Sequence, residues 1–223
     1  MTVGSTGANP VRAPQGRPYA GPFTLAAAGA LFVLYPVVRP YSDETTMAGA
    51  DAFAAPTWIV AHLCAVVGFV LLPLGLLSLR TALASGPRAR SASAAFLMVW
   101  IGVGLTLPYY GAEVFALNAI GDRVVRTGDT TLLQLVEAIR LGPVQATAFA
   151  TGLLLIAAGT ILAAVAVWRS DTMPRWSSVP LATGFTLFLP QFFGPPPLRI
   201  VHGVLVGVGC LTLAAAVRAS RRP

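Results

Sequence analysis

A series of apolar runs, each close to the length that a helix needs to cross a bilayer, constrains this chain more than any other feature. About 20 mostly apolar residues, at ~1.5 Å each, span the hydrocarbon core. Six segments qualify or nearly do: 22–38, 58–79, 94–120, 144–168, 179–193 and 198–217. We therefore predict an all-α integral membrane protein, a bundle of six transmembrane helices in the plasma membrane.

Composition agrees with lipid as the solvent. The chain of 223 residues is 56% hydrophobic and only 10% charged, whereas soluble domains carry roughly 25% charged residues. Its net charge of +7 comes from arginines, which cluster at the ends of the apolar runs. Arginines in those places set the orientation of membrane helices. We therefore expect membrane lipids as partners and no nucleic acid.

The arginines also predict the orientation. With the N-terminus inside and six crossings, ten of the fifteen arginines fall on the inner side and five on the outer side. An excess of arginine marks the cytoplasmic side. We therefore place both termini in the cytoplasm, with a disordered tail at 1–21, a membrane domain at 22–219 and a second tail at 220–223.

One connection has the pattern of a short helix of its own. Residues 129–141 alternate apolar and polar side chains with a helical period, and Asp129 or Thr130 can serve as the N-cap. The dipeptide Gly142-Pro143 separates this segment from the next apolar run. We predict an interfacial helix on the outer side that lies on the membrane or folds over the mouth of the bundle.

Polar residues inside the runs gather near one end. Glu113 lies within an apolar run, where an ionised carboxylate costs roughly 2.5 kcal/mol or more. Counting inward from the outer ends, His62, Glu113 and His202 all lie roughly 7 to 12 Å deep. Tyr109 and Tyr110 precede Glu113 by one helical turn and share its face, as Arg199 does with His202. A polar pocket that opens outward is therefore expected. Its predicted lining is His62, Tyr109, Tyr110, Glu113, Arg199 and His202.

We expect this pocket to bind or convert an amphipathic, lipid-derived or isoprenoid compound. A carboxylic acid in apolar surroundings can stay protonated, so Glu113 could act as a general acid. His62 and His202 are the other catalytic candidates. Arg199 could hold a phosphate or carboxylate head group, and Tyr109 and Tyr110 could stabilise a developing cation.

Other interpretations stay open. No cofactor is predicted, but His62, Glu113 and His202 are a ligand set of some zinc sites, and the two histidines could ligate haem. The bundle could also be an accessory, sensing or assembly subunit, or a proton-coupled carrier in which Glu113 titrates. Each polar residue also has a purely structural interpretation, and the sequence does not determine the oligomeric state.

Overall fold

The structure is a computed structural model, and it describes residues 20–221. Within that range the chain consists of helices and irregular connections, and it contains no strands. The α-helices are α1 (Ala20–Val38), α2 (Met47–Ala54), α3 (Pro56–Ala82), α4 (Ala89–Gly111), α5 (Leu117–Thr127), α6 (Gln134–Leu141), α7 (Pro143–Trp168), α8 (Val179–Thr186) and α9 (Pro196–Ala219). A π-helical turn, η1 (Ala112–Ala116), joins α4 to α5, and the 3-10 turns are η2 (Thr130–Leu133), η3 (Arg175–Ser178) and η4 (Pro190–Phe193). The predicted tails lie almost wholly outside the described residues.

Five helical stretches are long and apolar enough to cross a membrane. They are 20–38, 56–82, 89–127, 143–168 and 196–219, and they coincide with five of the six predicted runs. The remaining predicted run, 179–193, contains the short helix α8 and the turn η4 instead of one long helix. Pro180 and Pro190 lie within this segment, and each lacks the backbone N–H that a continuous helix requires.

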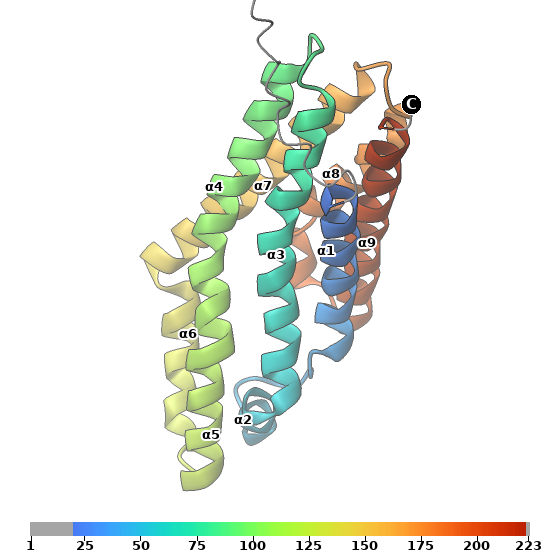
Figure 1. Ribbon diagram of the computed structural model, residues 1–223. Helices are drawn as coiled ribbons and strands as arrows, with labels where there is room; N and C mark the ends of the chain where they lie inside the picture. Colours follow the sequence, from blue (N-terminus) through green and yellow to red (C-terminus); the bar gives the residue numbers. More distant parts are fainter. Residues whose placement is uncertain (1–19, 222–223) are drawn as a thin grey trace, which may run out of the picture.

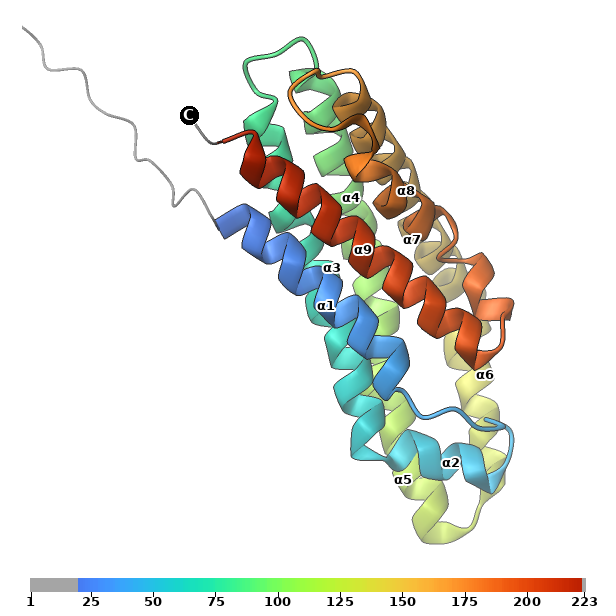
Figure 2. The ribbon, with the colours of Figure 1, turned by 90° about the vertical axis from the view of Figure 1, so that its right-hand side faces the viewer.

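The long helices form one bundle (Figure 1). α1 packs against α3 and α9, and α4 packs against α7, with α8 beside α9. The start of α1 and the end of α9 lie at the same end of the bundle (Figure 2). The crossings are close because glycines lie at them: a Cβ added at Gly102 would come within 2.6 Å of the Gly152 carbonyl oxygen. Phe32 fills the centre, edge-on to Phe69 at 5.1 Å and to Phe185 at 5.6 Å between ring centroids.

A second, smaller core lies at the opposite end. α2, α5, η2 and α6, which we call the cap, gather beyond the ends of α1 and α9 (Figure 1). The stretch 89–127 has 39 residues, so at ~1.5 Å per residue it is far longer than a ~30 Å hydrocarbon core requires. Its last part, α5, therefore belongs to the cap. The buried residues of the cap core are Ala50, Phe53, Trp58, Leu117, Val124, Leu133 and Val136.

The predicted helix at 129–141 is present as η2 followed by α6. Asp129 is the N-cap of η2, and its carboxylate accepts a hydrogen bond from the Thr131 backbone N–H at 3.1 Å. The apolar face of this segment packs into the cap core. Gly142 ends α6 and Pro143 begins α7, as their sequence pattern predicted.

Candidate functional site

Glu113 lies in the π-turn between α4 and α5 and is 6% exposed. π-turns inside α-helices occur frequently at functional sites. The Glu113 carboxylate accepts two hydrogen bonds from one guanidinium, from Arg140 Nε at 2.5 Å and from Arg140 Nη2 at 2.8 Å. Arg140 comes from α6, so this bidentate ion pair fastens the cap onto the membrane-spanning helices. Such charge-assisted pairs are about twice as strong as neutral hydrogen bonds.

The ion pair continues into a chain of four charges. Arg140 Nη1 also contacts Glu44 Oε2, and Arg39 Nη2 donates to Glu44 Oε1 at 2.6 Å. Burial alone would raise the pKa of the Glu44 carboxyl, but Arg140 and Arg39 together hold it below its usual value. Burial would lower the pKa of the Arg140 guanidinium, but its bonds to Glu113 and the charge of Glu44 raise it. Glu44 and Arg140 therefore stabilise each other's charged forms.

Trp58 and His62, both on α3, complete the surroundings of Glu113. The Trp58 indole N–H donates to the Glu113 backbone carbonyl at 2.7 Å. His62 Nδ1 lies 2.8 Å from the Trp58 carbonyl oxygen. Because a carbonyl oxygen can only accept, Nδ1 carries a proton, and Nε2 faces Glu113 Oε2 at 3.7 Å. That separation is too long for a hydrogen bond, so His62 lies next to the carboxylate without binding it.

A large cavity opens beside this network, with a volume of about 940 Å³. Aromatic rings form much of its wall, and Tyr109 stacks on Phe149 at 3.9 Å between centroids. Tyr110 is 2% exposed and its hydroxyl lies close to that of Tyr35, yet it makes no hydrogen bond of normal geometry. The Tyr110 hydroxyl is therefore enclosed beside Tyr35 and is not open to the cavity.

The opposite wall carries a cation. Arg199, near the start of α9, lines the cavity and donates to the carbonyl oxygens of Phe192 at 2.7 Å and Gly194 at 3.2 Å. Within residues 20–221 its guanidinium pairs with no carboxylate. At the mouth, Phe193 is 93% exposed and Leu141 is 66% exposed. The cavity therefore joins an unneutralised positive charge to an apolar rim.

His202 lies apart from the other predicted residues. His202 Nε2 lies 2.8 Å from the Gly184 carbonyl oxygen, and its ring packs edge-on against Phe188. It lines a small adjoining cavity next to Gln191, not the large one. The structure therefore brings together five of the six predicted pocket residues, namely His62, Tyr109, Tyr110, Glu113 and Arg199. His202 is not part of the lining of the large cavity, because equal depth on two helices does not mean that the side chains face each other.

Sequence reasoning missed the partners of Glu113. It did not predict Arg140 as the arginine that pairs with this carboxylate. It also did not predict Glu44, Arg39 or Trp58 as parts of the site. Among the described residues, no three His, Cys, Asp or Glu side chains come close enough to hold a metal ion. Haem binding stays a hypothesis that would require His62 and His202, which line different cavities, to reach one iron.

The fold defines a class of protein: a helical protein with several helices able to span a membrane, and with an aromatic, charged cavity at one end of its bundle. No protein-family model matches the chain, and no curated protein or solved structure shows significant similarity to it.

Proposed function

We propose that this protein binds an amphipathic, lipid-derived or isoprenoid compound with an acidic head group in the large cavity. One observation carries the proposal: the cavity is lined by the Arg199 guanidinium, which pairs with no carboxylate within residues 20–221. A phosphate or carboxylate would pair with this group. The aromatic walls suit the apolar remainder of such a molecule.

Binding is better supported than conversion. Acid catalysis by Glu113 would require a proton on its carboxyl group, but both of its oxygens accept bonds from Arg140. Those bonds stabilise the carboxylate form. A catalytic role would therefore need Arg140 to withdraw and a proton to enter between His62 and Glu113. We assign Glu113 to holding the cavity wall in place.

We further propose that the chain crosses the plasma membrane six times, with both ends in the cytoplasm and the cap outside. The excess of arginine at one end supports this orientation. The common position of both described ends supports an even number of crossings (Figure 2). The segment 179–193, which lies between α7 and α9, would be the fifth of the six crossings, and α9 the sixth.

Cysteine labelling from the outside tests the orientation, in a background without Cys64 and Cys210. The outer side needs an exposed position at which a cysteine can be introduced. Gly49 in α2 is unsuitable, because a Cβ there would lie 2.5 Å from the Glu44 Cα. Ala48 is exposed on α2 and suits the purpose, and Gly86 has open space at the other end. Ala48→Cys should be labelled by an impermeant reagent and Gly86→Cys should not. Labelling of Gly86→Cys alone would contradict the orientation.

The ligand proposal is tested by native mass spectrometry of the protein purified in mild detergent. We expect an additional mass, identified after release as an acidic amphipathic compound. Arg199→Gln should weaken ligand retention about tenfold, the factor that ~1.4 kcal/mol gives, and Arg90→Gln, at the other end of the bundle, should leave it unchanged. An additional mass that both variants keep would place the ligand elsewhere. A bare protein under every condition would favour an accessory subunit.

A further inference from the structure

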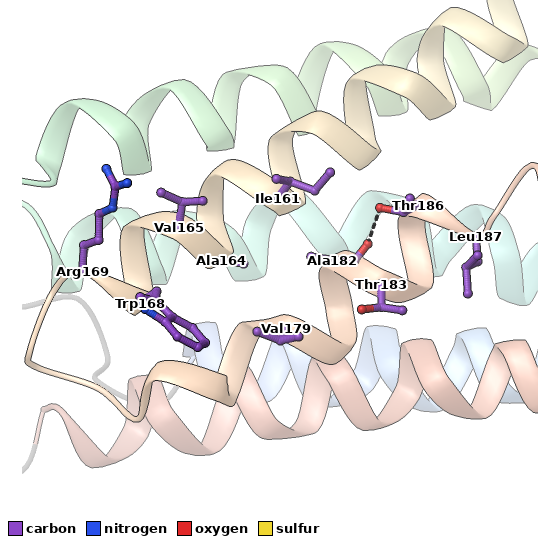
Figure 3. A pocket seen from close by; sticks show the side chains of 10 residues that line it. All are labelled: Ile161, Ala164, Val165, Trp168, Arg169, Val179, Ala182, Thr183, Thr186 and Leu187. Carbon is purple, nitrogen blue, oxygen red and sulfur yellow. Dashed lines mark hydrogen bonds between the residues drawn. The ribbon is translucent and has the colours of Figure 1, made fainter.

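A second hollow lies at the other end of α7, between α7 and α8 (Figure 3). α7 has 26 residues, but α8 has only eight. The short helix cannot cover the whole length of its neighbour. A groove of about 500 Å³ is left between the two helices.

The groove is apolar along its length. Ile161 and Val165 of α7 line it opposite Val179 and Leu187 of the α8 segment. Thr186 also lines it, but its hydroxyl donates to the Ala182 carbonyl of its own helix at 2.8 Å (Figure 3). A bound water needs two to four polar partners, and this groove offers few. Its occupant must therefore be largely hydrocarbon.

One end of the groove differs from the rest. Arg169 follows the last residue of α7 and lines this end, together with Trp168 (Figure 3). Within residues 20–221 the Arg169 guanidinium has no ion pair and no hydrogen bond. Trp168 stands edge-on to Trp176 at 4.5 Å between ring centroids. Tryptophan is enriched at the boundary between hydrocarbon and water, so the groove runs from the membrane interface toward the bilayer interior.

We propose that this groove is a binding site for an anionic phospholipid, with an acyl chain between α7 and α8 and the phosphate group at Arg169. A hydrocarbon chain matches the apolar lining, and an anionic head group matches the unpaired cation. Basic pockets between membrane helices bind acidic lipid head groups elsewhere on the same grounds. A helix from a second protein would leave the charge of Arg169 unneutralised, so we favour the lipid.

This site is independent of the large cavity. The α7 residues that line the large cavity end at Ala150, whereas those of the groove begin at Ile161. The inference therefore does not depend on the ligand proposed for the large cavity. Arg199→Gln should leave lipid binding in the groove unchanged.

The test is a native mass spectrometric titration of delipidated protein with phosphatidylglycerol or phosphatidylcholine of the same chain length. We expect the protein to prefer phosphatidylglycerol about fivefold, as one arginine at a membrane surface gives. Arg169→Gln should abolish that preference. Thr183→Phe, an exposed position that lines the groove, should reduce binding of both lipids.

Arg175→Gln is the matched control. Arg175 is at the same end of the bundle, but it lies 3.5 Å from Asp171 and does not line the groove. Its removal should leave the preference intact. Equal losses in the two arginine variants would show general charge attraction and overturn the proposal. Unchanged lipid binding in Thr183→Phe would also overturn the proposal. A dimer that only Thr183→Phe dissociates would show that a second protein, and not a lipid, occupies the groove.

Discussion

The membrane-spanning bundle and the cap are built on different physical principles. Outward-facing positions of the long helices are apolar, as at Val67, Leu154 and Val201, which are 44%, 61% and 64% exposed. Outward-facing positions of the cap mix apolar and charged side chains, as at Leu135, which is 48% exposed, and at Arg126, which pairs with Asp122 at 2.8 Å on the surface of α5. The surface of the cap is therefore more polar than that of the long helices.

The difference decides what stabilises each region. Inside lipid the hydrophobic effect does not drive helices together, and close contact between small residues does so instead. The crossing of α4 and α7 at Gly102 and Gly152 shows this arrangement. In water the cap gains stability from burial of Phe53 and Val136, at about 25 cal/mol per Å² of apolar surface. The cap core is small, so the cap depends on its attachment to the bundle.

That attachment is polar. Arg140 of α6 in the cap binds the carboxylate of Glu113, which lies in the π-turn at the end of α4. The large cavity adjoins this junction, so a ligand in it would contact both regions. A substitution at the junction should therefore weaken the contact between the two regions more than a substitution within either region does.

The largest effect is expected from Arg140→Met. It leaves the Glu113 carboxylate buried without its main partner, which costs about 3 kcal/mol at the low end of the usual range for buried ion pairs. Hydrogen exchange should rise in α5 and α6 before α3 unfolds. Arg123→Met, an exposed change on α5, should have little effect. The double variant Glu113→Leu/Arg140→Met should recover most of the loss, and additive losses would show that the ion pair does not join the regions.

A somewhat smaller effect is expected from Gly102→Ala, which tests the bundle alone. The added Cβ would lie 2.6 Å from the Gly152 oxygen and 3.0 Å from the Ile156 nitrogen, so α4 and α7 must separate. Overpacking of this kind costs about 2 kcal/mol. The midpoint of thermal unfolding in detergent measures it. Gly104→Ala has open space around its Cβ and is the control. Equal midpoints for the two variants would show that this crossing is not tightly packed.

The bundle could be predicted from the sequence far better than the cap. Lipid demands long apolar runs, so the run predicted at 144–168 matches Pro143–Trp168 within one residue. The run predicted at 94–120 continues as helix to Thr127, because α5 is amphipathic and no break separates it from α4. The amphipathic pattern of 129–141 did predict a helix. It did not show which surface the helix would cover.

The site was predicted in part for a related reason. Counting residues along a helix gave a common depth for His62, Glu113 and His202, of which His62 and Glu113 line the large cavity. The count gives no information on the direction that each helix face takes, and His202 lines the smaller adjoining cavity. The Glu113–Arg140 contact joins residues 27 positions apart in the sequence. It depends on how α6 folds back, which no local pattern encodes.

The smallest effect is expected from lowering the pH, which should destabilise the junction more than the bundle. The pKa of Glu44 is lowered in the folded protein. A carboxyl with a lowered pKa adds stability above its unfolded value, about 4.3 for Glu, and loses it as the pH falls through the lowered value. The cap should therefore loosen below about pH 4 while the bundle keeps its packing.

Single-tryptophan proteins can follow the two regions separately, with Trp58 at the junction and Trp168 at the far end of α7. Thermal transitions at about pH 6 and about pH 3.5, on either side of the ordinary glutamate pKa, should differ more for Trp58 than for Trp168. Glu44→Gln should lower the Trp58 transition at pH 6 and remove much of its acid dependence. Asp43→Asn is the control, because the pKa of Asp43 is also lowered, but by Thr45 and not by the network. If Asp43→Asn rather than Glu44→Gln removed the acid dependence, the loop before α2, and not the ion pairs of Glu44, would control how firmly the cap is attached.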